Sequence, residues 1–423
     1  MRRMTRGTQG TEATEGTQGA FTSLVSLLSL LSLVSLVASV SALLPTLALA
    51  DTLTFHGDYQ RTGRFPAAGP VAPGVLWKFQ AAGSIVASPV IGPDGTVYLA
   101  GTDGRLYALT PDGSKKWEFQ AEESLFTTPS LDAWGRLYFG DLDGWFYSLY
   151  PDGSLRWKYR LAEGTDRRIL GSPAVSPEGV SFVAAWNNQL YSISPDGGLL
   201  WQAALNGLPT GAPALDGLGN VYVACLDSSD AQLAVYKFTP ISPTPVWTCR
   251  EPLWNSSNRV IASPAIETDR NNLYIGTCTN TAGLVIALDL TDGQVVFRKS
   301  LPKGILSSPA IRDDGIVLVG CLDGKLYALD GQNGAERWVY ETGAPYVFGS
   351  PAVDRQGNAY VGDSDGTVHA ISRGGQRLWK LTSDANVESA PVVDGGRLYV
   401  TSFDSSLYVV GRNANRRWRE RRR

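Results

Sequence analysis

The chain has 423 residues, of which 43% are apolar and 18% are charged, and this charged fraction is below the roughly 25% usual for soluble domains. Its 46 Gly and 24 Pro favour many short elements joined by tight turns, while 12 Trp, 17 Tyr and 13 Phe exclude a disordered chain. With 2 His and no Cys-His cluster, a zinc site is not expected. Residues 1–50 and 412–423 are basic within a net charge of −3, so residues 51–411 are acidic and do not bind nucleic acid.

Residues 1–50 have the pattern of an export signal. A weakly basic leader precedes an uncharged apolar run over 21–44, and Ala48 and Ala50 occupy the small-residue positions of a cleavage site before Asp51. An uncleaved membrane anchor is the alternative, because about 20 apolar residues span a bilayer. Both interpretations predict an extracytoplasmic protein, periplasmic or secreted, and after cleavage no stable membrane insertion.

The remainder of the chain repeats one unit, whose most regular feature is a small residue followed by Pro. Each such anchor is followed by a strand, an Asp-Gly or similar turn, two further strands and a final strand that contains Trp. A period of 40–50 residues with four short strands predicts an all-β, eight-bladed propeller of four-stranded antiparallel blades over residues 75–411. The anchors are Ser88-Pro89, Thr128-Pro129, Ser172-Pro173, Ala212-Pro213, Ser263-Pro264, Ser308-Pro309, Ser350-Pro351 and Ala390-Pro391.

An aromatic column ends the units, and we expect its rings to pack between neighbouring blades. Trp77 precedes the first anchor and is predicted to provide the outer strand of the last blade, so that N- and C-terminal strands close the ring. Trp418 competes for that place. Residues 51–74 would then be a strap, and residues 412–423 an Arg-rich tail that is either solvated or a clamp on an anionic surface. The column consists of Trp77, Trp117, Trp157, Trp201, Trp247, Phe297, Trp338 and Trp379.

The residues around each Trp, such as the Asp-Gly-Ser-Lys-Lys-Trp of 112–117, resemble the tryptophan-docking repeat of pyrroloquinoline-quinone (PQQ)-type propellers. The segment 55–63 is similar to the opening strap of secreted members. The superfamily contains quinoprotein dehydrogenases and non-enzymatic scaffolds, such as the propeller lipoprotein of the outer-membrane β-barrel assembly machinery. No Cys precedes Cys225, so this chain departs from that lipoprotein in having no lipid-attachment Cys.

The dehydrogenase resemblance would imply PQQ and calcium, held by a carboxylate and an Asn beside an Asp base. Many such enzymes also have adjacent cysteines near the cofactor and long insertions between blades. This sequence has no adjacent cysteines, mostly short repeats and no evident cluster of the six to eight oxygens that calcium prefers. We therefore expect no enzyme activity and no PQQ or calcium cofactor.

Several residues with chemical potential have structural explanations. His369 stands in a column that is Tyr in five other units, and His56 has no partners at triad spacing. The segments 141–144 and 363–366 resemble calcium loops but are followed at once by strands, which favours hairpin turns. The cysteines are expected to be mostly buried thiols, with one disulfide left open: Cys225, Cys249, Cys278 and Cys321.

Four Trp residues lie outside the repeat column. Trp134 lies in a turn between first and second strands, whereas Trp145 and Trp186 flank turns between second and third strands, and Trp254 lies in a crossing between blades. Turns between second and third strands open on the same face of a propeller as the crossings between blades. Loop aromatics beside arginines have the composition of a binding patch, although they could equally cap the propeller. The candidate binding face is Trp145, Trp186, Trp254, Arg167 and Arg168.

The sequence therefore predicts a non-catalytic extracytoplasmic scaffold that binds a protein or peptide partner on this loop face. A PQQ- and calcium-dependent dehydrogenase is one alternative. A glycan-binding module, in which exposed Trp rings would stack on sugars, is the other.

Overall fold

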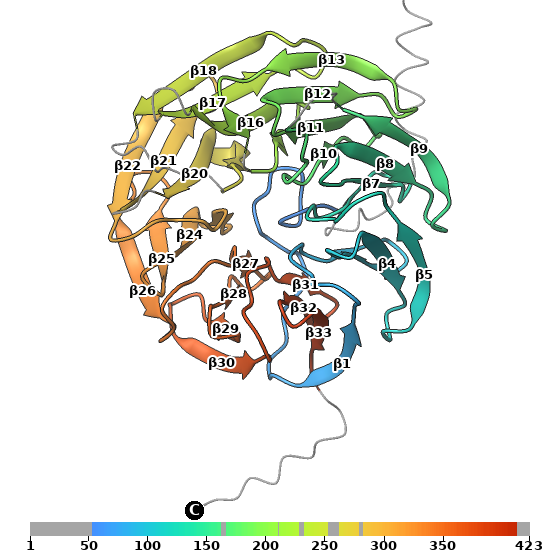
Figure 1. Cartoon of the computed structure of the whole chain (residues 1–423). Helices are drawn as coiled ribbons and strands as arrows, with labels where there is room; N and C mark the ends of the chain where they lie inside the picture. The colour runs from blue at the N-terminus through green and yellow to red at the C-terminus, as the bar shows by residue number, and fades with distance from the viewer. Residues whose placement is uncertain are drawn as a thin grey trace, which may run out of the picture. The chain divides into compact units, whose positions relative to one another are not determined.

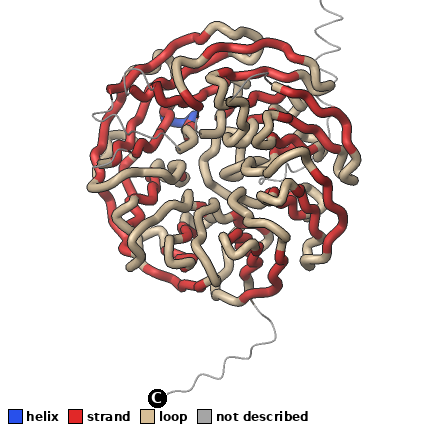
Figure 2. Tube along the Cα trace, viewed as in Figure 1, coloured by secondary structure: helices blue, strands red, loops and turns tan. Residues whose placement is uncertain are grey.

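The computed structural model describes residues 53–161, 166–209, 211–227, 232–252, 262–278 and 282–412. These residues form eight antiparallel sheets that follow one another around a ring (Figure 1). Strands lie toward the periphery and loops fill the centre, with a single 3-10 turn at Thr268–Arg270 in the described part of the chain (Figure 2). The expected eight-bladed, all-β propeller is confirmed. The proposed signal peptide 1–50, Trp254 and Trp418 lie outside the described residues.

The first four blades begin at the innermost strand and proceed outward. Blade 1 contains β2 (Val90–Ile91), β3 (Val97–Ala100), β4 (Arg105–Leu109) and β5 (Lys115–Gln120). Blade 2 contains β6 (Ser130–Leu131), β7 (Leu137–Gly140), β8 (Trp145–Leu149) and β9 (Leu155–Arg160). Blade 3 contains β10 (Ala174–Val175), β11 (Ser181–Ala185), β12 (Gln189–Ile193) and β13 (Leu199–Ala204). Blade 4 contains β14 (Leu208–Pro209), β15 (Ala214–Leu215), β16 (Val221–Asp227), β17 (Gln232–Phe238) and β18 (Pro245–Pro252).

The other four blades complete the ring. Blade 5 contains β19 (Ala265–Glu267), β20 (Asn272–Cys278), β21 (Gly283–Asp289) and β22 (Val295–Leu301). Blade 6 contains β23 (Ala310–Ile311), β24 (Ile316–Cys321), β25 (Lys325–Asp330) and β26 (Glu336–Glu341). Blade 7 contains β27 (Ala352–Val353), β28 (Ala359–Gly362), β29 (Thr367–Ile371) and β30 (Arg377–Thr382). Blade 8 contains β31 (Val392–Asp394), β32 (Arg397–Ser402), β33 (Ser406–Val410) and, from the other end of the chain, β1 (Val75–Gln80).

Blade 4 departs from the expected four strands. Its second strand, β16, is seven residues long, so it extends past the anchor and pairs with two short inner strands, β14 and β15. In every blade the burial of the strands follows their position. The second strands are almost entirely buried because neighbouring blades cover both faces, whereas outer strands such as β5 alternate between exposed and half-buried residues.

The Trp column joins consecutive blades, as expected. Each indole Nε1 donates a hydrogen bond to a backbone carbonyl of the next blade, at 2.8 Å from Trp157 to Pro195 and 3.0 Å from Trp117 to Pro151. The ring packs on a turn glycine with positive φ, where a Cβ at Gly153 would lie 2.7 Å from the Trp117 ring. Trp379 of blade 7 donates instead to Pro70, which precedes β1. The segment before β1 thus takes the place of the turn that blade 8 lacks.

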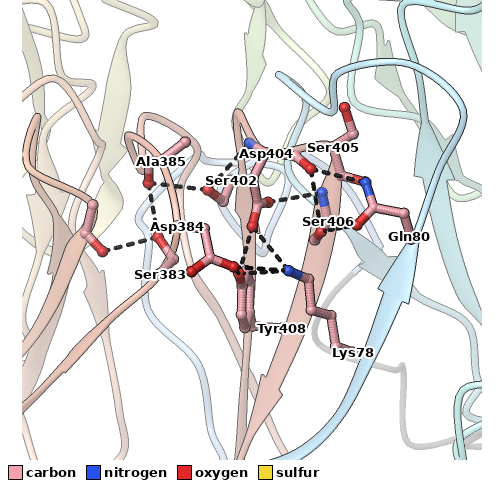
Figure 3. Close-up of polar contacts among 11 residues, drawn as sticks. Lys78, Gln80, Ser383, Asp384, Ala385, Ser402, Asp404, Ser405, Ser406 and Tyr408 are labelled. Atoms are coloured by element: carbon pink, nitrogen blue, oxygen red, sulfur yellow. Dashed lines mark hydrogen bonds and ion pairs between the residues drawn. The ribbon is translucent and has the colours of Figure 1, made fainter.

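The ring closes where β1 pairs with β33, so Trp77 and not the tail provides the outer strand of blade 8. Polar contacts fix this closing seam (Figure 3). The Lys78 ammonium lies 3.0 Å from Asp404 Oδ2 and 3.2 Å from Asp384 Oδ2, and it donates to the Tyr408 hydroxyl at 2.8 Å. Gln80 Nε2 donates to the Asp404 carbonyl at 2.9 Å, which fixes the register two residue pairs further along.

The strap before β1 crosses the centre of the ring (Figure 1) and pairs with the innermost strands. Its carbonyls accept backbone N–H bonds from five blades, for example from Leu131 to Leu53 and from Ile311 to Thr62, each at 2.7 Å. Arg61 is fully buried in the strap and donates to the carbonyls of Pro173 and Pro213, each at 3.0 Å. A segment that lies outside the blades therefore ties most of them together.

The eight small-residue anchors form a ring of hydrogen bonds around the central axis. The backbone N–H of one anchor donates to the side-chain hydroxyl of the anchor in the next blade. Two links of this ring are missing because Ala212 and Ala390 have no hydroxyl to accept the N–H of Ser172 and Ser350. The links run from Ser88 to Thr128, Thr128 to Ser172, Ala212 to Ser263, Ser263 to Ser308, Ser308 to Ser350 and Ala390 to Ser88, at 2.8 to 3.0 Å.

Candidate binding surface and central cavity

Turns between second and third strands contact the crossings from one blade to the next, and we call the face that they share the crossing face. Backbone bonds join the two kinds of loop, from Leu125 N–H to the Gly101 carbonyl at 3.2 Å and from Trp186 N–H to the Arg168 carbonyl at 3.0 Å. Trp145 begins β8 directly after such a turn, and Trp186 directly follows β11. Both Trp residues therefore lie on the crossing face because of their position in the repeat.

Arg168 stacks on Trp186. Its guanidinium carbon lies 4.1 Å from the centre of the indole ring, and its Nε lies 3.0 Å from Asp166 Oδ1. A cation above an aromatic face is attracted by about 0.5–1 kcal/mol at an exposed site. The indole Nε1 of Trp186 is buried and has no hydrogen-bond partner among the described residues. The stack therefore presents a planar cation over an indole whose polar atom is unsatisfied.

Trp145 is connected to the same arrangement through Asp143, two residues before it. The Arg167 guanidinium donates through Nε to the Asp143 carbonyl at 2.8 Å, and that of Arg160 donates to Asp143 Oδ2 at 2.9 Å. Lys158 Nζ lies 4.6 Å from the centre of the Trp145 ring. Four of the five residues of the sequence-derived binding face are thus linked across blades 2 and 3. We call Trp145, Arg167, Arg168 and Trp186 the Trp–Arg surface.

Trp134 lies on the opposite face, in the turn between β6 and β7. Its side chain is 58% exposed and the Arg136 guanidinium carbon lies 4.5 Å from its ring centre. It is therefore a second Trp–Arg stack, separate from the Trp–Arg surface.

The other residues considered in the sequence make structural contacts. His369 is buried, and its Nε2 lies 2.8 Å from Asp363 Oδ2. At the equivalent position of blade 2, the Tyr147 hydroxyl lies 2.8 Å from Asp141 Oδ2, so His369 makes the contact that Tyr makes there. The Asp141 carboxylate also accepts the backbone N–H of Trp145 at 2.9 Å. The D-x-D-G segments are hairpin turns in which the first Asp bonds its own turn.

His56 is buried in the strap, with Nδ1 at 2.9 Å from the Arg61 carbonyl and Nε2 at 2.8 Å from the Pro351 carbonyl. Burial, together with the smaller effect of the nearby Arg61 charge, lowers the pKa of His56 to about 4, although the hydrogen bonds to the Arg61 and Pro351 carbonyls raise it. The ring is therefore neutral at pH 7 and ties the strap to blade 7.

No disulfide joins the four cysteines, all of which lie in the described residues, so the bridge left open by the sequence does not form. Cys225 and Cys321 are buried, as expected, while Cys249 and Cys278 are half-buried. Burial raises the pKa of Cys225 to about 12 and that of Cys249 to about 11, so both stay protonated at neutral pH.

The sequence analysis did not identify the central cavity, which has a volume of about 290 Å³. The anchors line it together with Phe55 of the strap. Around them lies a second ring, made by the residue two positions before each anchor, and five of its six described members are apolar. In blade 8 this residue is Glu388. Alignment of the repeats on their anchors places Glu388 in one column with the apolar residues, so this signal is present in the sequence. The described members of the second ring are Val86, Phe126, Leu170, Leu306, Phe348 and Glu388.

The described lining of this cavity does not fit PQQ with calcium. It contains one carboxylate, Glu388, whereas calcium takes six to eight oxygen ligands. It contains no Lys or Arg to pair with the acidic groups of the quinone. Across the described part of the chain, no group of three His, Cys, Asp or Glu side chains could hold a metal ion.

Within the described ranges, no helix has the length and apolar character needed to cross a bilayer.

The blade architecture and the Trp docking define a β-propeller of the PQQ-type superfamily. A family model described as "Outer membrane protein assembly factor BamB" matches residues 45–170, 147–270 and 235–423. The chain belongs to this family.

Individual relatives match over shorter segments. The outer membrane protein assembly factor BamB of Shewanella oneidensis is 32% identical over 154 residues, which are 33% of this chain and 38% of that protein. The same factor of Yersinia pestis is 27% identical over 172 residues, or 37% of this chain and 42% of that protein. The chain thus matches about two fifths of the length of these curated relatives.

Solved structures match over the whole propeller. BamB from Moraxella catarrhalis superposes with a TM-score of 0.67 at 19% identity, over 81% of this chain and 100% of that chain. A europium-containing methanol dehydrogenase superposes with a TM-score of 0.71 at 14% identity, over 85% and 98%. At these identities the similarity establishes the fold alone, and it includes both scaffolds and enzymes.

Proposed function

We propose that this chain is a non-catalytic, extracytoplasmic scaffold in the assembly of outer-membrane proteins, and that it binds a protein partner through the Trp–Arg surface. Membership of the family supports a role in outer-membrane protein assembly, because the relatives reported above are outer membrane protein assembly factors. The lining of the central cavity, with its single carboxylate, supports a role without PQQ.

The observation that carries the proposed binding role is the linkage of Trp145, Arg167, Arg168 and Trp186 across two blades on one face. Aromatic and Arg side chains dominate binding energy at protein interfaces. The Arg168 side chain is 45% exposed and is held over the indole, so a partner meets it already ordered and loses little side-chain entropy on binding. Its Nε and Nη2 are bonded to Asp166, which leaves Nη1 as the nitrogen that an acidic group of the partner would meet.

The test is cross-linking and pull-down of the tagged full chain in the envelope of its source organism. Wild type should capture an outer-membrane β-barrel protein or a component of its assembly machinery. The double variant Trp186→Ala with Arg168→Ala should capture at least tenfold less, at an unchanged melting temperature.

Trp134→Ala with Arg136→Ala provides the matched control, because it removes an equivalent stack from the opposite face and should leave capture unchanged. Equal capture by both double variants would overturn the assignment of the surface. Dye reduction by the protein reconstituted with PQQ and calcium, or specific binding on a glycan array, would overturn the scaffold function.

The extracytoplasmic location is tested separately by sequencing the N-terminus of the exported protein. We expect it to begin at Asp51, because Ala48 and Ala50 suit signal peptidase. An intact N-terminus in the membrane fraction would establish the anchor instead.

A further inference from the structure

Among its six described members, the second ring of the central cavity has one that breaks the apolar pattern of the repeat; in the sequence the same position is Thr210 in blade 4 and Ile261 in blade 5, so Glu388 is its one charged residue. Val86, Phe126, Leu170 and Phe348 are among the apolar members, and all of them are half-buried around the cavity. In blade 8 the same position is Glu388. Departures from a local rule in an otherwise regular fold concentrate at functional sites.

Glu388 has no charged partner to explain it. Among the described residues it forms no ion pair, and the described lining of the cavity contains no basic side chain. Burial raises the pKa of its carboxyl group, against a side-chain hydrogen bond with Asn386 that lowers it. A carboxylate placed among apolar groups costs free energy unless a cation pairs with it.

The shape and chemistry of the cavity select its occupant. Phe126, Phe348 and Leu170 contribute apolar and aromatic surface to the lining of the cavity, together with Phe55 of the strap and the anchor residues. A volume of about 290 Å³ is at the lower end for small-molecule pockets and suits one long side chain. Lys and Arg place methylene stems on apolar surface and a cation beyond them, and phenyl faces attract such a cation.

We propose that the central cavity binds a Lys or Arg side chain of a peptide segment, with its cation paired to Glu388 and its stem against the phenylalanines of the second ring. This site is distinct from the Trp–Arg surface. It accepts a basic side chain, whereas the Trp–Arg surface favours acidic groups. A partner that carries both kinds of residue would engage both sites on the crossing face.

The probe is the peptide acetyl-Leu-Lys-Leu-amide, titrated calorimetrically into the protein as it is exported. Its isosteres with norleucine or Glu in place of Lys serve as comparisons. We expect the Lys peptide to bind at least tenfold more tightly than the norleucine peptide, and the Glu peptide not to bind. Equal affinity for the Lys and norleucine peptides would overturn the proposal, as would no saturable binding of the Lys peptide at millimolar concentration.

Variants of Glu388 test whether its carboxylate is the group that recognises the Lys ammonium. Glu388→Gln should abolish the preference for Lys over norleucine, whereas Glu123→Gln, which removes an exposed carboxylate from the crossing from blade 1 to blade 2, should retain it. Glu388→Leu, which restores the apolar pattern of the column, is the second variant if Gln impairs folding. A preference that persists in either folded variant would overturn the role of Glu388.

The two proposals fail separately. Trp186→Ala with Arg168→Ala should leave affinity for the Lys peptide unchanged while reducing partner capture. Loss of peptide binding in that variant would overturn the cavity as a site in its own right.

Discussion

The Lys78 ammonium and the Asp404 carboxylate lie 3.0 Å apart although 326 residues separate them in the chain. Lys78 belongs to the first strand of the propeller and Asp404 to the last hairpin, so this pair joins the two ends of the fold. The Tyr408 hydroxyl, which accepts from Lys78 and donates to Asp404 at 2.5 Å, completes the contact (Figure 3).

Lys78→Met should have only a small effect on stability, because the Lys78 side chain is 34% exposed and such ion pairs are worth about 0–1 kcal/mol. The difference between wild type and variant should decrease further at high salt, where charges are screened. Urea unfolding at low and high salt measures it. A difference that stays the same at high salt would show that the ion pairs do not make the contribution.

Trp77→Ala should lower the free energy of unfolding by about 3 kcal/mol, as truncation of a packed Trp does. The ring packs on Gly113 and its Nε1 donates to Pro111 at 3.1 Å, so the substitution loosens the seam between blades 8 and 1. Deletion of residues 412–423 should leave the melting temperature nearly unchanged. A large loss on deleting the tail would show that Trp418 contributes to closure.

The stability of the propeller should depend on the ionisation of His56. Its pKa is lowered to about 4 in the folded protein and is about 6.5 in the unfolded chain, so the unfolded state binds the extra proton first as pH falls. Stability should therefore decrease between pH 6.5 and 4, by about 3 kcal/mol in total from this group.

His56→Gln should flatten that part of the stability profile, as measured by denaturant unfolding at several pH values. Nuclear magnetic resonance of the ring should show neutral imidazole at pH 6. An imidazolium signal at that pH would contradict the assigned direction of the shift.

Ala212→Ser should stabilise the protein. The new hydroxyl would accept the N–H of Ser172 and restore one of the two missing links in the anchor ring, at a gain of about 1 kcal/mol. Ser308→Ala should have the opposite effect, because the N–H of Ser263 loses its acceptor at 2.9 Å. Paired unfolding curves of the two variants measure both changes. A destabilised Ala212→Ser would show that the cavity wall has no room for the hydroxyl.

The repeat in the sequence determined the number of blades, the hairpin turns and the docking of Trp117 and its equivalents, because each of these depends on residues within one unit or on its immediate neighbour. It also predicted closure through Trp77, since a propeller cannot leave its first and last blades unpaired. The convergence of Trp145 and Trp186 on one face followed from the same regular order of strands.

Only the tertiary structure decided what lies at the centre of the ring. The Ser350 hydroxyl and the Arg61 guanidinium bond groups of other parts of the chain, and Glu388 lines a cavity to which all eight blades contribute; no spacing in the sequence specifies these arrangements. The sequence showed the anchors as boundaries between units, yet in the structure six of the eight possible hydrogen bonds join them into a ring, because eight blades bring equivalent positions to a common axis. Local patterns determine each blade, whereas closure of the ring creates the cavity and its lining.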